Sequence, residues 1–418
     1  MGTKKNKIKK TIEADPSADR ILEKIFGYAI DQEVSSILID LSLEQPAVFY
    51  KIIDDWKKVI DIPENTKADI SKSIKRKAGI KDSKDDLPVC GSFKIGDIGS
   101  KMVFQVSVNP VKKSEKIFID LFKSRSKLFD LRQLGLQRIE LQRVEANLQK
   151  SSGITLVLGG FDSGRTSTLY SLLDYLNRPE LNIMTIEKEI DHDLPDINQI
   201  CLDPASGFDH SLAIESIFKQ DPDIIMIGDI FDKKTADNAL EAAHKGFPVL
   251  AGLYSGNMIS ALQLLKDLDV SLPLFLQKSN IIIDQKVVKK ICHHCISKDR
   301  RSASKIKELK KNFDWKYLMP RLKELKIIPS HIKSVDDLVF YKGQGCPRCD
   351  NTGFHGSIGV YELLEVDESV KKLISEGHIS KIKEEVRRQG GFYIKEDALI
   401  KGFNGITTID QILEIIKQ

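Results

Sequence analysis

The sequence feature that most constrains the fold is a glycine-rich segment, GGFDSGRT, at residues 159–166. Its spacing is that of the phosphate-binding loop G-x-x-x-x-G-K-[ST], except that Arg165 stands in place of the lysine. The apolar residues 154–158 before it predict a buried strand. Leucines at three- and four-residue steps after it predict a helix over residues 166–176. Strand, glycine loop and helix together predict an α/β fold with a site for an anion.

The loop supplies the candidate nucleotide-binding residues. Glycines let the backbone approach a ligand, and N–H groups at a helix N-terminus bind phosphate oxygens. The Thr166 hydroxyl is a candidate Mg²⁺ ligand, whereas Arg165 is not equivalent to lysine and Asp162 adds a negative charge inside the loop. A glycine-rich turn without a ligand stays open as an alternative. The candidate binding residues for ATP or ADP with Mg²⁺ are Gly159, Ser163, Gly164, Arg165, Thr166 and Ser167.

Three further apolar runs predict strands at residues 183–186, 224–227 and 249–253. Strands that alternate with helices from about residue 150 to 290 predict a mostly parallel α/β sheet. Glu187 and Asp229 follow two of these strands, where a carboxylate can approach Mg²⁺ and an attacking water. They are the candidate catalytic residues, and ordinary acidic surface turns are the alternative.

Four of the six cysteines form two C-x-x-C pairs, Cys292 with Cys295 and Cys346 with Cys349. Two such pairs supply the four thiolates of a tetrahedral zinc site. Because all four positions are filled, the predicted Zn²⁺ is structural rather than catalytic. Two alternatives stay open: unligated thiols, and a ligand role for one of the two histidines inside the first pair.

Charge and hydropathy exclude several classes of protein. A net charge of +4 on 418 residues gives no strong bias towards nucleic acid. No apolar run approaches the roughly 20 residues that span a bilayer, and no secretory segment is visible, so we expect a cytoplasmic protein. Lysines near the N-terminus predict a basic disordered tail, and weak contact of this tail with anionic lipid stays open.

The order of these motifs resembles that of the secretion ATPases of type II secretion and type IV pilus assembly, over residues 18–418. Residues 163–170, 220–228, 359–364 and 405–408 carry the resemblance, with the cysteine pairs. It implies a RecA-like P-loop NTPase domain, a smaller N-terminal α/β domain and a four-cysteine zinc module near the C-terminus. It also implies ATP hydrolysis by a hexameric ring, which reaches the inner membrane through a platform protein. We expect the additional N-terminal docking domain of many members to be missing.

The motifs and the resemblance together divide the chain into five segments. We expect a basic tail over residues 1–17 and an N-terminal α/β domain over 18–135. The RecA-like domain is expected over 136–290, the zinc-binding module over 291–360 and a C-terminal helical segment over 361–418.

Residues expected to act on phosphate, Mg²⁺ or water depart from the family pattern. The loop lysine is Arg165, and the catalytic glutamate of the family falls on Asp229, whose side chain is one methylene shorter. The apolar strands and cysteine pairs persist, so the scaffold is retained while groups that act on phosphate are replaced. The other departures are Asp162, Lys188, Asp191, Phe231, Phe247 and Tyr254, with Gln105 and Lys116 in the N-terminal domain.

Two hypotheses follow for function. In the first, a divergent member of a homomeric or mixed ring binds nucleotide weakly and hydrolyses it poorly or not at all, because each lost group that stabilises phosphoryl transfer costs about 10³-fold. In the second, an active ATPase powers pilus or pseudopilus assembly with a rearranged site: Arg165 binds phosphates, Glu187 and Asp229 orient Mg²⁺ and water, and Lys116 or Lys188 adds positive charge. A scaffold that binds no nucleotide is a third interpretation.

Overall fold

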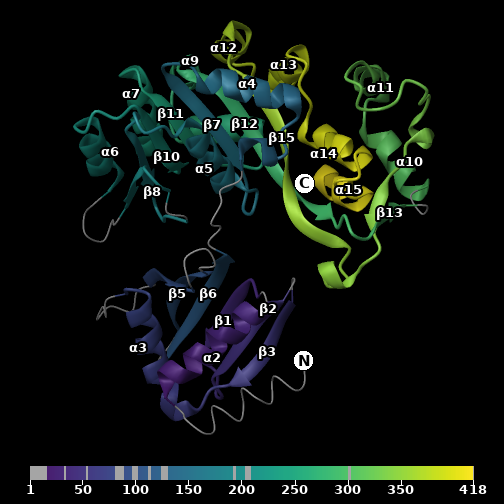
Figure 1. The fold of residues 1–418 in the computed structure, drawn as a ribbon. Helices are drawn as coiled ribbons and strands as arrows, with labels where there is room; N and C mark the ends of the chain where they lie inside the picture. The colour runs from purple at the N-terminus through teal and green to yellow at the C-terminus, as the bar shows by residue number, and fades with distance from the viewer. Residues whose placement is uncertain are drawn as a thin grey trace. The chain divides into compact units, whose positions relative to one another are not determined.

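The protein, described here from a computed structural model, divides into two compact units, Met1–Lys127 and Leu128–Gln418 (Figure 1). The structure describes residues 17–32, 34–52, 55–80, 89–96, 102–111, 114–123, 130–191, 194–202, 209–299 and 303–417. The predicted N-terminal tail lies outside these residues, apart from Ser17. The predicted RecA-like, zinc-binding and C-terminal segments all lie within the second unit, so they share one compact body.

The first unit is a six-stranded antiparallel sheet with the order β3-β2-β1-β6-β5-β4, packed against helices. Helix α2 buries Ile21, Leu22, Ile25 and Phe26, which recur at the spacing of one helical face and contribute to the apolar core. The elements are α2 (Ala18–Asp31), β1 (Ser36–Asp40), β2 (Ala47–Ile52), β3 (Asp55–Asp61), α3 (Lys67–Lys77), β4 (Val89–Ile95), β5 (Met102–Val111) and β6 (Ser114–Lys123).

The second unit is built on a seven-stranded sheet with the order β15-β12-β7-β11-β10-β8-β9. Neighbouring strands from β12 to β9 are parallel, and β15 pairs antiparallel with β12. The mostly parallel sheet predicted from the sequence is thus confirmed. The strands are β7 (Gly153–Gly159), β8 (Ile183–Glu187), β9 (Asn198–Cys201), β10 (Ile224–Ile230), β11 (Pro248–Tyr254), β12 (Ser279–Ile291) and β15 (Phe354–Glu365).

Helices cover both faces of this sheet, because its buried strands carry apolar side chains on each side. Along β7, Leu156 and Leu158 belong to the core that includes α6 to α9, whereas Val157 belongs to the core that includes α4 and α5. Because β7 to β12 run parallel, their carboxyl ends lie at a single edge of the sheet, where ligands bind in folds of this kind. The helices are α4 (Arg138–Leu148), α5 (Arg165–Leu176), α6 (His210–Phe218), α7 (Lys233–His244), α8 (Met258–Asp267) and α9 (Leu272–Gln277).

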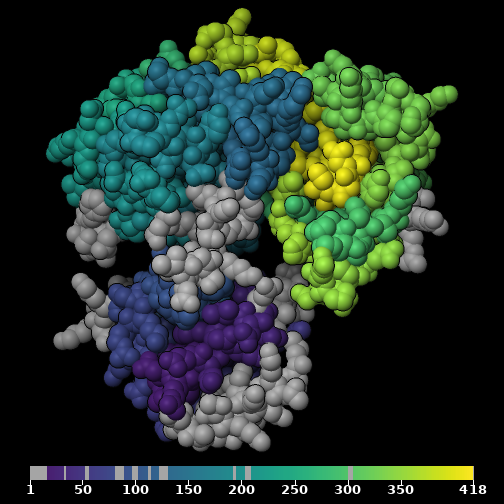
Figure 2. Space-filling view, in the orientation of Figure 1, coloured from purple at the N-terminus to yellow at the C-terminus, as the bar shows by residue number. Residues whose placement is uncertain are grey.

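The C-terminal residues pack into the second unit. Val288 of β12 and Val360 of β15 share an apolar cluster with α10, α11, α14 and α15, and Figure 2 shows yellow C-terminal atoms beside green ones of the preceding segments. No helix in the described part of the chain is long and apolar enough to cross a bilayer. The remaining elements are β13 (Ile296–Lys298), α10 (Ala303–Asn312), α11 (Trp315–Glu324), β14 (Tyr341–Gly343), α12 (Glu368–Ser375), α13 (Ile382–Arg388), α14 (Ile394–Phe403) and α15 (Ile409–Lys417).

A buried carboxyl group in β12 makes the stability of the second unit depend on pH. Burial, and secondly the charge of Glu362, raises the pKa of Asp284 to about 8. The folded chain thus keeps a proton that the unfolded chain releases near pH 4, so the free energy of unfolding falls as pH rises from about 4 to 8, by up to about 1.4 kcal/mol per pH unit. Asp284→Asn is expected to flatten this slope in urea unfolding. An unchanged slope, equal to that of the surface control Asp267→Asn, would contradict the assignment.

Candidate nucleotide and metal sites

The glycine-rich loop joins β7 to α5 as predicted. Gly159 ends β7, and a Cβ atom on it would lie 2.1 Å from Ser163 Oγ, so only glycine fits. Gly164 precedes the first residue of α5 with φ 80°, which favours glycine. Ser163 Oγ is buried and has no hydrogen-bond partner among the described residues. A close-packed loop, a helix N-terminus and this unpaired hydroxyl fit the binding of phosphate.

The departure at Asp162 keeps the backbone shape of the loop. Its φ is +55°, in the left-handed region that glycine adopts readily and aspartate tolerates better than most residues. The side chain is exposed. The aspartate therefore occupies a position suited to the family's glycine and adds a negative charge at the surface of the loop.

Arg165, the first residue of α5, folds back over the loop. One guanidinium nitrogen donates to the Gly159 carbonyl over 3.1 Å, and the other donates to Asp229 Oδ2 over 3.1 Å. The Tyr254 ring centroid lies 6.0 Å from the guanidinium carbon. Arg165 is only 17% exposed. The structure thus brings together two sequence-predicted residues that are 64 positions apart, and pairs the cation of the loop with the candidate catalytic acid.

Asp229 lies near the end of β10, at the loop edge of the sheet. Burial raises the pKa of its carboxyl group above the ordinary value, and the charge of Arg165 opposes this shift. A phosphate that binds Arg165 must displace this carboxylate or stay beside it. Either event costs free energy, because two negative charges would share one site.

Glu187, the second candidate catalytic acid, is tied into a buried hydrogen-bond network. It is 4% exposed, and its carboxylate accepts from Thr185 Oγ1 over 2.6 Å, from Gln199 Nε2 over 3.1 Å and from the Tyr170 hydroxyl. Burial raises its pKa. In this arrangement Glu187 holds α5 to β8 and β9 rather than contacting the Arg165–Asp229 pair.

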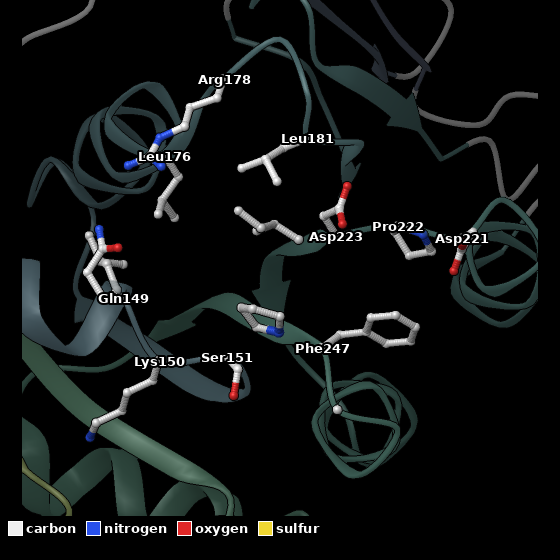
Figure 3. A pocket seen from close by; sticks show the side chains of 14 residues that line it. Gln149, Lys150, Ser151, Leu176, Arg178, Leu181, Asp221, Pro222, Asp223 and Phe247 are labelled. Carbon is white, nitrogen blue, oxygen red and sulfur yellow. The ribbon is translucent and has the colours of Figure 1, made fainter.

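Of the three family positions at which an aromatic residue stands, two lie at the loop edge and one does not. Phe231 follows β10 and Tyr254 ends β11, and both are more than half exposed. Phe247 instead precedes β11 and lines a cleft of about 470 Å³ at the opposite edge, where Ser151 and Pro222 also lie (Figure 3). It stacks on Phe218, with ring centroids 5.9 Å apart. Its replacement of a histidine is therefore not a loss at the nucleotide site, a correction to the sequence interpretation.

The two lysines considered as sources of positive charge have different surroundings. Lys116 on β6 forms an ion pair with Asp40, with 3.0 Å between nitrogen and oxygen, inside the first unit. Lys188 follows β8 and is exposed, and its charge lowers the pKa of Asp229 as a minor contribution. Within the second unit, Lys188 therefore places a positive charge near the loop edge.

The four paired cysteines lie together. Their sulfur atoms are all within 4.8 Å of one another, and three of the separations are 3.7, 3.8 and 3.9 Å. A tetrahedral site with Zn–S bonds of about 2.3 Å requires sulfur atoms about 3.8 Å apart. The two C-x-x-C turns are held by Gly343 and Gly353, which pack so closely that a Cβ on Gly343 would lie 2.0 Å from the Gly353 carbonyl oxygen. This geometry fits a four-thiolate metal site.

Sequence reasoning missed two kinds of supporting residue. Tyr170, Thr185 and Gln199 surround Glu187, and no local motif connects them. Gln285 of β12 donates through Nε2 to the Ser163 carbonyl over 2.7 Å, and it is 1% exposed. An amide beside Asp284, between the apolar residues 281–283 and 287–288, was the available signal for a buried polar contact.

Comparison with known proteins agrees with the resemblance drawn from the motifs. A family model described as "Type II/IV secretion system protein" matches residues 12–414. The type IV pilus assembly ATPase PilB of Thermus thermophilus is 28% identical over 405 residues, which cover 96% of this chain and 43% of the relative. The type II secretion system ATPase E of Vibrio cholerae is 26% identical over 407 residues, which cover 97% of this chain and 76% of the relative.

Solved structures share the fold. The pilus retraction motor PilT with bound ADP aligns with a TM-score of 0.63 at 18% identity, covering 94% of this chain and 96% of the other. The Legionella pneumophila ATPase DotB aligns with a TM-score of 0.62 at 16% identity, covering 95% of each chain. Since the family model spans nearly the whole sequence, the chain belongs to the type II/IV secretion system protein family.

Proposed function

We propose that the protein is a cytoplasmic component of a type II secretion or type IV pilus motor ring that binds nucleotide weakly and hydrolyses it slowly or not at all. The observation that carries the proposal is the Arg165–Asp229 ion pair, with 3.1 Å between its atoms. The cation at the lysine position of the loop is already neutralised by the carboxylate at the position of the catalytic base. The ring would be a homomeric or mixed hexamer, peripheral at the inner membrane through a platform protein.

The loop residues would bind the nucleotide, and the acids would contribute little to its cleavage. Gly159, Ser163, Gly164, Arg165, Thr166 and Ser167 would contact the phosphates or Mg²⁺, which supplies charge neutralisation when bound. Asp229 is shorter than glutamate and held by Arg165, and misplacing a base by about 1 Å can cost 10²-fold. Glu187 already accepts three hydrogen bonds, so orienting water or Mg²⁺ would require this network to open.

We further propose that Cys292, Cys295, Cys346 and Cys349 bind one structural Zn²⁺ per chain. The sulfur separations support this ligand set, and four thiolates leave no open position for catalysis. The metal would fix the two turns that flank β13, α10, α11 and β14.

The ion pair makes a specific prediction for binding. Asp229→Asn is expected to tighten binding of a fluorescent ATP analogue about tenfold, because it frees Arg165 and removes a charge that repels phosphate. Arg165→Ala is expected to weaken binding, as measured by the same equilibrium titration.

Asp223→Asn is the matched control, because Asp223 immediately precedes the first residue of β10, whereas Asp229 lies near its last residue. Equal affinities for wild type, Asp229→Asn and Arg165→Ala would refute a role for the pair in binding. If Asp229→Asn instead leaves binding intact and abolishes substantial turnover, the protein is the active ATPase of the alternative hypothesis.

A further inference from the structure

Gln285, which is buried in β12, forms a hydrogen bond with the glycine-rich loop. β12 runs parallel to β7, and Asp284 pairs in register with Leu158, so Gln285 lies beside the point where β7 becomes the loop. Its side-chain nitrogen donates to the Ser163 carbonyl over 2.7 Å. The loop is thereby attached to a strand of the central sheet as well as to its own flanking elements.

This contact fixes the orientation of the peptide that precedes α5. A trans peptide is planar, and its C=O and N–H point in opposite directions. With the Ser163 carbonyl turned towards Gln285, the Gly164 N–H points away from β12. The first N–H groups of a helix have no intrahelical acceptor, so they are the groups that bind phosphate at such a terminus. The amide of Gln285 thus holds one phosphate donor in its binding orientation.

The side chains packed around Gln285 and Gly164 leave little space for the Ser163–Gly164 peptide to adopt another orientation. A Cβ on Gly164 would lie 3.3 Å from Gln285 Nε2 and 3.2 Å from Val287 Cγ2. Gln285 Oε1 is buried and has no hydrogen-bond partner within the described part of the chain. A buried amide with an unpaired oxygen costs free energy that an apolar side chain would avoid. Of the two polar atoms of this amide, Nε2 forms the hydrogen bond to the loop and Oε1 forms none among the described residues.

We propose that Gln285 is a positioning residue for phosphate binding, which keeps the Ser163–Gly164 peptide turned so that its N–H faces the nucleotide. The inference rests on the proposed nucleotide binding at this loop. It adds a residue outside the loop, and outside every candidate set from the sequence, on which that binding depends.

Gln285→Met tests the contact without adding charge. This variant keeps the length of the side chain and lacks the donor, so affinity for a fluorescent ATP analogue is expected to fall about tenfold. Asn280→Leu is the matched control, because it also removes a side-chain donor without adding charge: Asn280, also on β12, donates to the Ser152 carbonyl over 2.8 Å at the other edge of the sheet. It should lower the unfolding temperature without changing the affinity.

Gln285→Glu separates positioning from general stability. An ionised carboxylate cannot donate to the Ser163 carbonyl, whereas a protonated one can, and burial raises the pKa of the introduced group. The affinity ratio of this variant to wild type is therefore expected to approach one as pH falls, while the ratio for Gln285→Met stays constant. The ionisable groups on the neighbouring elements are Asp162, Arg165, Asp284, Lys286, Tyr361 and Glu362.

The outcomes separate this inference from the proposed function. If wild type binds nucleotide and Gln285→Met binds equally well, the positioning role is wrong while nucleotide binding stands. If Gln285→Met weakens nucleotide binding but the affinity of Gln285→Glu relative to wild type does not change with pH, then Gln285 contributes only through packing. If wild type itself binds no nucleotide, the proposed function fails first.

Discussion

Purified protein supplied with ATP and Mg²⁺ is expected to turn over at least about a thousandfold more slowly than a typical enzyme, whose kcat is about 10 s⁻¹. One observed contact and two replacements implied by the family resemblance lead to this value. Arg165 is engaged by Asp229, Asp229 is one methylene shorter than the family's glutamate, and Phe231 stands at an arginine position. Loss of one positive group that stabilises the transferring phosphoryl can alone account for about 10³-fold. The turnover rate is measured as the steady-state release of phosphate.

Restoring the family residues should recover part of the activity. The double variant Arg165→Lys with Asp229→Glu is expected to hydrolyse ATP at least about tenfold faster than wild type, since it supplies a compact cation and a longer base. Arg165→Lys with Asp223→Glu is the control, because it adds the same chemical groups with the acid at the wrong end of β10. Wild-type turnover of about 10 s⁻¹ that Arg165→Ala abolishes would contradict impaired hydrolysis and favour the active-ATPase hypothesis.

Loss of the proposed zinc ligands is expected to have the largest effect on stability. Cys346→Ala with Cys349→Ala should reduce bound zinc from one ion per chain to none and expose the segments from β13 to β14 to hydrogen exchange, because metal binding is coupled to folding. Structural zinc sites in small peptides bind with about 10–16 kcal/mol. Here the apolar cluster that includes α10, α11, α14 and α15 should limit the damage to this region.

The two remaining cysteines provide the control for this experiment. Cys90 and Cys201 are exposed, and neither belongs to the four-cysteine cluster. Replacing both with alanine should leave the zinc content and the exchange pattern unchanged. Freshly reduced wild type without zinc by elemental analysis would refute the metal site, and zinc lost equally from both double variants would point to adventitious binding.

The parts of the fold that the sequence predicted are those with local signals. Strand β7, the loop and helix α5 are contiguous in the chain, and β8, β10 and β11 were each recognised as a single apolar run. The cysteine pairs were visible because C-x-x-C spacing is itself the geometry of a metal site. In each case, neighbouring residues in the chain carry the information.

Contacts between distant segments could not be predicted in the same way. The pairing of Arg165 with Asp229 depends on β10 lying beside β11 and β11 beside β7, which the sequence does not state. The Glu187 network and the Gln285 contact likewise join separate strands. The placement of Phe247 was within reach of the sequence, because it precedes β11 while Tyr254 ends it, so the two must lie at opposite edges of a parallel sheet.

Recovery of the nucleotide that the protein holds tests weak binding with impaired hydrolysis most directly. The protein is incubated with Mg²⁺ and ATP labelled at the γ-phosphate, separated from free nucleotide, and the bound species is quantified beside an Arg165→Ala sample. With hydrolysis impaired, the bound nucleotide is expected to be mostly intact ATP and to be depleted in the Arg165→Ala sample. Stoichiometric ADP with released labelled phosphate would contradict impaired hydrolysis, and nucleotide at background level in both samples would contradict binding at this loop.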